Sequence, residues 1–462
     1  MTVVNSAPAR TVLLYGLAIA MISGANFIVS PLLLQLLGHD GFAAWSLLEP
    51  VVLALLPVAG LGIQIGLLHR LAEEPASRGV VIAALFPFHV GTSVLVGAAG
   101  ACMALAFGAP IETAALLFGV VTVEALMVFF ISVWRARNEP GLYALLEAGR
   151  AVAVVIVLAA ILAITSSASL TTDGYLSIRL LLSGLAVLAA VVVMRPKFHP
   201  DWNEFTRAFR YGAPIVLASM MAAILANMDR YALDSADGPL LAGYVVHTKL
   251  AQLLLPAAAA FYMWYAPRAM QHLNQGEAAH PFFVESTSLF YFVLVGICAN
   301  AWFLAELLWP FLFPSVTFDR PLFALLLMGT AFYAMGNPLS LGTLRSGKTH
   351  HATLLTIIAT LVAAAACFAL APQLGTEGAA IGRMLGMGAY TVFFATHTIR
   401  TLGVRYPVVA YVLLGVGAAG VCVVIDSMLP WDLVVMKLAL VNLLIGSAFI
   451  PWRRFVTQRY IS

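Results

Sequence analysis

The candidates for chemistry in this sequence are charged side chains inside long apolar stretches. Glu124, Arg150 and Lys249 lie near the middle of such stretches. Five more lie nearer to an end: Glu49, Arg179, Asp229, Arg230 and Arg383. A charge at the centre of a bilayer costs roughly 2.5–3.5 kcal/mol on insertion scales, so it usually faces protein or a water-filled cavity. These eight residues are therefore our candidate site residues.

The bases in these stretches favour an anionic substrate, because Arg and Lys suit phosphate groups and a wet cavity lined by cations attracts an anion. The six are Arg150, Arg179, Arg230, Lys249, Arg383 and Lys437. An exporter of organic cations would sooner display carboxylates and aromatics. Glu49 and Glu124 are candidates for coupling to an ion or proton, with a purely structural hydrogen-bonding role as the alternative.

Two simpler interpretations of these charges remain open at this point. Glu147 and Arg150 are three residues apart and share a helix face, so they could pair with each other. Four bases lie close enough to a segment end to extend to the interface: Arg179, Arg230, Arg383 and Lys437. Lys249 and Glu124 are the hardest to explain in either way.

The elements that must position these residues are membrane helices. The composition is 62% hydrophobic and 10% charged, with a mean hydropathy of +0.97, whereas a soluble chain is nearer a quarter charged. Runs of about 20 apolar residues match the length that a helix needs to cross the bilayer. The pattern predicts an all-α membrane protein with fourteen transmembrane helices, at 11–36, 43–69, 79–107, 111–135, 141–164, 174–194, 211–235, 240–266, 283–306, 320–344, 351–372, 377–399, 407–428 and 432–452.

Lysine and arginine are concentrated on one side of this topology. Of 24 basic residues, 17 fall in alternate connectors or at the termini, and one, Arg320, falls in a connector of the other side. The 17 are Arg10, Arg70, Arg78, Arg135, Arg137, Arg195, Lys197, Arg207, Arg210, Arg268, Arg345, Lys348, Arg400, Arg405, Arg453, Arg454 and Arg459. Cytoplasmic loops carry such an excess, so we expect both termini in the cytoplasm.

The longest inner connector, 195–210, carries two prolines and four basic residues and divides the chain. We expect an N-terminal six-helix lobe at 1–194, a cytoplasmic inter-lobe linker at 195–210, a second six-helix lobe at 211–400, and two additional helices with a cytoplasmic tail at 401–462. Six is an even number, so the lobes would be parallel repeats around a central cavity.

Other functions lack support in the sequence. The segment 342–349 (GTLRSGKT) matches the phosphate-loop pattern, but it joins two membrane segments instead of a strand and a helix, so we expect no nucleotide. We likewise expect no nucleic acid, no metal and no other cofactor, since the histidines lack ligand spacing and the four cysteines lie in apolar segments. The outer connectors are too short to hold catalytic groups, which argues for a transporter and against an enzyme.

Several motifs carry a resemblance to a known family. They are Leu36–Phe42 with Trp45, Gly60–Gln64 with His69–Ala72, Tyr211–Pro214 with Asn227–Tyr231, Gly243–Tyr244 with Lys249 and Pro267–Arg268, and Gly375–Ile381. In this order they resemble the bacterial polysaccharide flippases of the O-antigen and exopolysaccharide type. That family belongs to the multidrug, oligosaccharidyl-lipid and polysaccharide exporter superfamily.

This resemblance implies a flippase of the bacterial inner membrane. Its substrate would be an oligosaccharide on a polyprenyl diphosphate, moved from the cytoplasmic to the periplasmic leaflet by alternating access, with Asn26 and the residues of helices 1, 2, 7 and 8 near the cavity. A polysaccharide polymerase and glycosyltransferases are the expected partners, and coupling to a proton or sodium gradient is left open. The alternatives are a cation-coupled multidrug or small-molecule exporter on the same scaffold, a polysaccharide polymerase or ligase, and a scaffold without transport activity.

Overall fold

The computed structural model describes residues 7–63, 67, 78–137, 139–165, 170–233, 238–272, 277–340, 350–430 and 433–458. Every regular element in these ranges is a helix, and twelve helices are long and apolar enough to cross a membrane. The chain is therefore an all-helical, multi-pass membrane protein. It forms two compact units, residues 1–242 and 243–462, which we describe separately; the predicted lobe boundaries stay a prediction.

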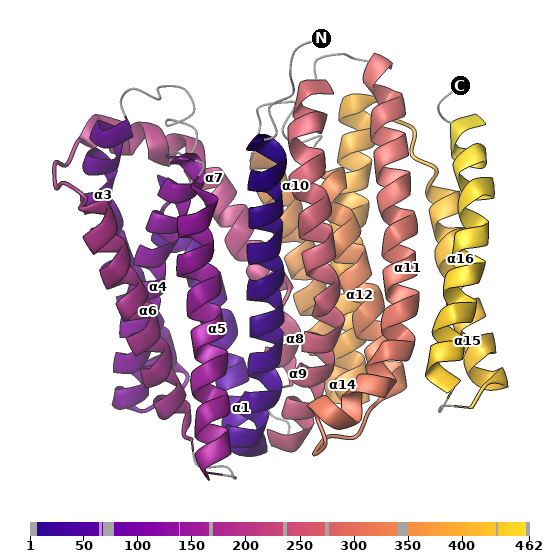
Figure 1. Ribbon diagram of the computed structural model, residues 1–462, viewed down its shortest axis with the longest axis horizontal. Coiled ribbons are helices and arrows are strands. Elements are labelled where there is room, and N and C mark those ends of the chain that lie inside the picture. The colour runs from indigo at the N-terminus through magenta and orange to yellow at the C-terminus, as the bar shows by residue number, and fades with distance from the viewer. Residues whose placement is uncertain are drawn as a thin grey trace. The chain divides into compact units, whose positions relative to one another are not determined.

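The first unit is drawn in indigo to magenta in Figure 1. Its helices are α1 (Ala7–Ala59), α3 (Arg78–Ala106), α4 (Ile111–Arg137), α5 (Pro140–Thr165), α6 (Thr172–Met194), α7 (Trp202–Leu225) and the short α8 (Met228–Ala232). Helix α1 packs beside α5 and α7, α3 packs beside α4, and α4 packs beside α6. Helix α4 therefore lies inside this unit, and Phe129, Phe130 and Trp134 belong to its apolar core.

The second unit runs from pink through orange to yellow in Figure 1. Helix α9 (Gly238–Ala251) leads into it through a 3₁₀ turn, η2 (Gln252–Leu254). The remaining helices are α10 (Leu255–His272), α11 (His280–Leu312), α12 (Arg320–Leu339), α14 (His350–Leu402), α15 (Val408–Met428) and α16 (Val434–Val456). Helices α12 and α14 pack along each other, and α11 also contacts α10, α12, α15 and α16.

Two of the twelve long helices contain a break. Helix α1 is interrupted at Gly38, with φ 68°, and α14 at Gly375, with φ 59°. Each is 53 residues long, whereas one crossing takes about 20. Both glycines fall in turns that the sequence predicts, between 11–36 and 43–69 and between 351–372 and 377–399. A glycine tolerates positive φ without a Cβ clash, and this explains why the chain changes direction there.

One predicted helix contains a turn, and one predicted helix start is wrong. Within the segment predicted to run from 43 to 69, α1 ends at Ala59 because Leu61 and Gly62 adopt positive φ values of 43° and 80°. Ile63 and Leu67 are again helical, and the other residues from 64 to 69 lie outside the described ranges. Helix α7 begins at Trp202 instead of 211, since the Asp201 carboxylate accepts hydrogen bonds from the Asn203 and Glu204 amides. The second half of the predicted linker 195–210 is therefore helical.

Helix α14 folds back on itself along a face of small residues. Gly378, Gly382 and Gly386 are four residues apart and face the first half of the same helix. A Cβ at Gly382 would lie 2.5 Å from the backbone nitrogen of Cys367, and one at Gly386 would lie 2.2 Å from the Ala363 Cβ. Small residues at this spacing let membrane helices approach closely, so the two halves pack backbone against backbone.

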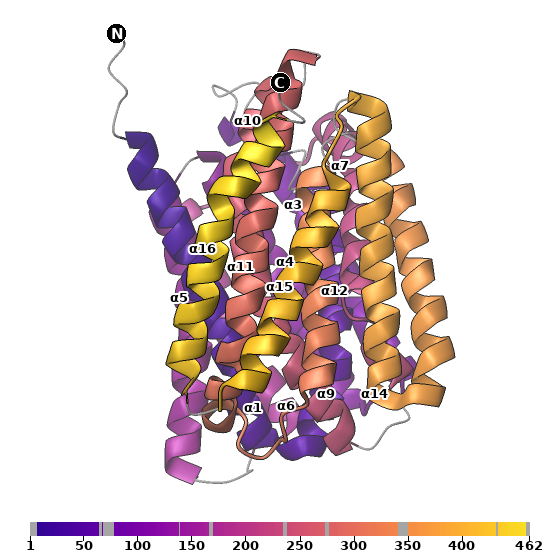
Figure 2. The same ribbon diagram turned by 90° about the vertical axis from the view of Figure 1, so that its right-hand side faces the viewer.

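Helices α15 and α16 lie side by side and are held on α11 by polar contacts (Figure 2). The Asn300 amide donates to Asn442 Oδ1 at 3.0 Å, and the Asn442 amide donates to Asn300 Oδ1 at 2.8 Å. The Tyr291 hydroxyl donates to the Tyr411 carbonyl at 2.6 Å. Hydrogen bonds between polar side chains stabilise helix packing in lipid, so these contacts hold α15 and α16 against α11.

The reciprocal amide pair should contribute a modest part of this attachment. Replacing Asn442 with leucine is expected to lower the stability of the second unit by about 0.6 kcal/mol, and by no more than ~1.7 kcal/mol, the range measured for interhelical hydrogen bonds in membranes. Thermal unfolding in detergent measures the loss. Leu443→Ala, on the exposed face of α16, is the control, and an equal effect of both changes would contradict the assignment.

Candidate functional site

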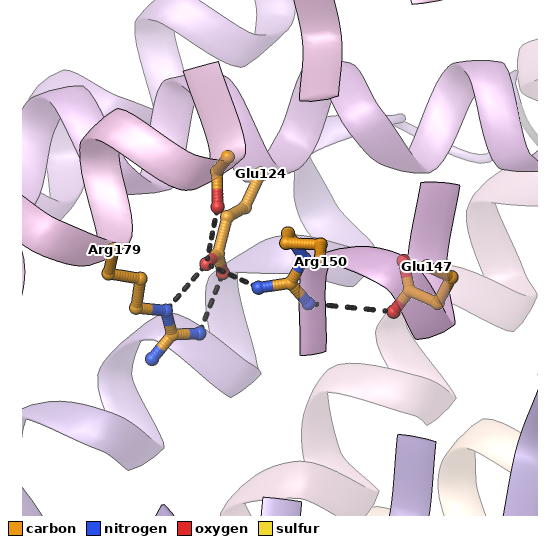
Figure 3. A network of polar contacts seen from close by, with 5 residues as sticks. Glu124, Glu147, Arg150 and Arg179 are labelled. Atoms are coloured by element: carbon orange, nitrogen blue, oxygen red, sulfur yellow. Dashed lines mark hydrogen bonds and ion pairs between the residues drawn. The ribbon is translucent and has the colours of Figure 1, made fainter. Parts of the chain in front are cut away.

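Four of the charged side chains in the first unit form one cluster, which we call the arginine–glutamate tetrad: Glu124, Glu147, Arg150 and Arg179 (Figure 3). Arg179 Nε and Nη2 donate to the two Glu124 oxygens at 2.5 and 2.7 Å. Arg150 lies between the two carboxylates, 3.5 Å from Glu124 Oε1 and 3.6 Å from Glu147 Oε1. Two cations and two carboxylates therefore balance each other inside the membrane segments.

The tetrad is positioned by α4, α5 and α6, which contribute Glu124, the pair Glu147 and Arg150, and Arg179 respectively. Glu124 is only 3% exposed and also accepts from the Ser183 hydroxyl at 3.4 Å. The Arg179 guanidinium lies 5.3 Å from the centre of the Trp45 ring. A bidentate pair stacked on an aromatic ring is a strong, directional arrangement, so Arg179 holds α6 to α4 and α1.

A second pair joins α8 to the second half of α1. Arg230 is fully buried, and its Nη1 donates at 3.0 Å to both the Ser46 carbonyl and Glu49 Oε2. Next to it, the Tyr231 hydroxyl donates to the Leu47 carbonyl at 2.9 Å. Asp229 is also buried, with 1% exposure. The structure thus brings three predicted site residues, Glu49, Asp229 and Arg230, into one region of the first unit.

The second unit holds the remaining bases. Lys249 lies in α9, one turn before the 3₁₀ segment, and is half-buried. Arg383 lies in the second half of α14 and is buried. Lys437 of α16 forms an ion pair with Asp426 Oδ1 at 2.6 Å, and Asp426 is also paired with Arg320. Arg230, Arg383 and Lys437 are all at most 1% exposed, so these three do not extend to the interface.

The pairing changes the electrostatic balance expected from the bases alone. In the first unit, three site cations (Arg150, Arg179 and Arg230) lie with four carboxylates (Glu49, Glu124, Glu147 and Asp229). The positive excess that the sequence suggests is thus absent from this set. The predicted Glu147–Arg150 pair is confirmed, whereas the partnership of Glu124 with Arg179 was missed. The pattern at 342–349 lies outside the described residues.

No family model matches this sequence, and no curated protein matches it either. Solved structures do match. The lipid II flippase MurJ in an inward closed conformation aligns with a TM-score of 0.70 at 12% identity, over 95% of this chain and 98% of that chain. An inward-facing multidrug resistance MATE family transporter of the MOP superfamily aligns with 0.63 at 17%, over 84% and 98%.

A mutant of the Vibrio cholerae MATE transporter VcmN aligns with a TM-score of 0.61 at 16% identity, over 86% of this chain and 98% of that chain. These matches extend over nearly the whole of each compared transporter. At such low identity they establish the fold, and the chain has the fold of the MurJ and MATE transporters.

Proposed function

We propose that this protein is a flippase that moves a lipid-linked oligosaccharide across the bacterial inner membrane by alternating access. The likeness to MurJ, whose name describes a lipid II flippase, is the observation that carries the proposal, because it covers 95% of this chain. The matches to the two MATE transporters cover 84% and 86% of this chain.

The proposal includes fourteen membrane crossings with both termini in the cytoplasm. We assign one crossing to each side of the break at Gly38 in α1 and of the break at Gly375 in α14, which would bring the twelve long helices of the described residues to fourteen crossings. The one-sided distribution of Lys and Arg supports the orientation. We retain lobes at 1–194 and 211–400, joined by 195–210, and an additional hairpin at 401–462.

The proposed substrate is an oligosaccharide attached to a polyprenyl diphosphate. Each unit would contribute bases for its anionic groups: Arg150 in the first unit, and Lys249 and Arg383 in the second. Arg150 contacts its carboxylates at 3.5 and 3.6 Å, longer than the contacts of Arg179 at 2.5 and 2.7 Å. Turning toward a phosphate would therefore cost Arg150 less ion-pairing energy than it would cost Arg179. The prenyl chain would stay in lipid. Glycosyltransferases and a polymerase are the partners that such a substrate requires.

Lys249→Ala tests the substrate site. Losing one hydrogen bond to a charged group costs about 1.5–3 kcal/mol, so surface polysaccharide in a complemented deletion strain should fall roughly ten- to a hundredfold, at a factor of ten per 1.4 kcal/mol. The control is Lys197→Ala, which removes an exposed lysine from the 195–201 connector. Both variants must reach the membrane in normal amounts. Normal polymer from Lys249→Ala would remove this residue from the mechanism.

A cation-coupled exporter is the second candidate, favoured by the MATE matches and by the carboxylates around Arg230. In that case the coupling candidates would be Glu49, which pairs with Arg230, and Glu124. Drug-resistance profiles of a deletion strain separate the two: an exporter predicts sensitivity to organic cations with normal polysaccharide, and a flippase predicts the reverse. A polymerase or ligase would instead leave the lipid-linked unit already outside, with altered polymer length or attachment.

A further inference from the structure

The two carboxylates of the tetrad are held in very different ways. Glu124 has contacts from Arg179 at 2.5 and 2.7 Å, from Ser183 at 3.4 Å and from Arg150 at 3.5 Å. Glu147 has one ion-pair contact, 3.6 Å from Arg150 Nη2. Its Oε2 is buried and has no hydrogen-bond partner among the described residues. Donors to a carboxylate stabilise the ionised form, so Glu124 is kept charged far more strongly than Glu147.

An ionised oxygen buried without a partner is costly, and binding a proton lowers that cost because a neutral group is cheaper to bury than a charge. The same imbalance appears on Arg150, whose Nε is also buried without a hydrogen-bond partner among the described residues. Its side chain is 12% exposed and that of Glu147 is 19% exposed. The Glu147 end of the tetrad is thus poorly satisfied and partly accessible, whereas the Glu124 end is closed.

Glu147 lies near the beginning of α5, close in sequence to a tyrosine. Glu147 lies seven residues after Pro140, or about 10 Å along the helix axis at 1.5 Å per residue. Tyr143 precedes it by one turn on the same face, and its ring lies 5.2 Å from the Tyr15 ring of α1. The Tyr15 hydroxyl is buried without a partner among the described residues. Phenolic hydroxyls both donate and accept hydrogen bonds, and these two phenols lie next to each other near this end of α5.

The charged groups near Glu147 and the two tyrosines come from α4, α5, α6 and the α4–α5 connector, and α1 contributes Tyr15. Arg150 of α5, Glu124 of α4 and Arg179 of α6 act on Glu147. Arg135 of α4 acts on Tyr143 and Tyr15, and Glu139 of the α4–α5 connector acts on Tyr15. Arg135 and Glu139 lie at the predicted cytoplasmic end, and Glu147 lies in the half of α5 that begins there.

We propose that Glu147 is a proton-binding site of the first unit, and that proton uptake there releases Arg150. The proton comes from water at the cytoplasmic end and bonds to Glu147 Oε2. Arg150 keeps its own protons and its charge, so the tetrad changes from neutral to a net single positive charge. Its affinity for an anion then rises. That this anion is the diphosphate of the substrate rests on the proposed function.

The test uses the purified full chain in liposomes and infrared difference spectra recorded as the pH is lowered. The wild type should gain a protonated-carboxyl band that Glu147→Gln loses. Glu147→Asp should keep a band at a shifted frequency. This variant shows that the band missing from Glu147→Gln was not lost because the protein misfolded. Glu112→Gln, at the exposed start of α4, is the matched control and should keep the wild-type band. A band that persists in Glu147→Gln, or no pH-dependent band in the wild type, overturns the proposal.

Binding of inorganic diphosphate separates this site from the proposed function. Wild-type affinity should rise as Glu147 takes up its proton, whereas Glu147→Gln, which mimics the neutral acid, should bind with the higher affinity at both pH values. If the infrared band belongs to Glu147 but diphosphate does not bind at any pH, the proton site is supported and the proposed diphosphate substrate is contradicted. Diphosphate binding with the same pH dependence in wild type and Glu147→Gln would contradict the release of Arg150.

Discussion

Replacing Glu124 with alanine should destabilise the first unit by about 3–5 kcal/mol, the usual loss when one partner of a buried ion pair is removed. The variant leaves Arg179 without its bidentate partner and Arg150 without one of its two carboxylates. Both arginines are largely buried, with side-chain exposures of 14% and 12%. Thermal unfolding followed by size-exclusion chromatography in detergent measures the loss.

The control for this change is Glu112→Ala, which removes a carboxylate from the exposed first turn of the same helix. It should unfold like the wild type, because surface charges contribute little. Equal unfolding midpoints for Glu124→Ala and Glu112→Ala would show that the tetrad is not a structural support of this unit.

Gly212→Ala should be nearly as disruptive, for a steric reason. A Cβ at position 212 would lie 2.2 Å from the Gly62 carbonyl oxygen and 2.4 Å from its Cα. These are backbone atoms of a turn that already has positive φ at Gly62, so no side chain can rotate away. Overpacking of this kind costs typically 1–3 kcal/mol and occasionally more, and we expect the upper end.

A matched glycine shows whether the contact, and not the added methyl group, is responsible. A Cβ added at Gly184 of α6 would meet no heavy atom within 4 Å, so Gly184→Ala should be neutral. Unfolding in detergent compares the two variants. Wild-type stability of Gly212→Ala would mean that α7 and the turn at Gly62 do not pack backbone against backbone.

The helices and their turns could be predicted from the sequence because hydrophobic length alone decides them in a membrane. Gly38 and Gly375 lie in predicted turns, and the helices α3 to α6 begin and end within a few residues of the predicted spans. The turn after Ala59 and the start of α7 at Trp202 were missed, since the local backbone at Leu61 and Gly62 makes the turn and the Asp201 side chain caps the helix.

The site was harder to predict because ion pairs between helices depend on how each helix is rotated. Glu147 and Arg150 are three residues apart on one helix, and their pairing was predicted from that spacing. Glu124 and Arg179 are 55 residues apart on different helices, and no pattern in one sequence links them. The close approach of Gly62 and Gly212 joins two of the motifs behind the family resemblance, which the motifs alone could not reveal.

The most direct test of the flippase is movement of its substrate between leaflets. Liposomes containing the purified protein and a fluorescent polyprenyl-diphosphate oligosaccharide are treated with a membrane-impermeant reagent that acts on the sugar. We expect the protein to expose the inner-leaflet pool to the reagent, and we expect Lys249→Ala to slow this exposure while Lys197→Ala does not. An inner pool that stays protected with active protein present, together with gradient-driven uptake of an organic cation, would contradict a flippase and favour the exporter.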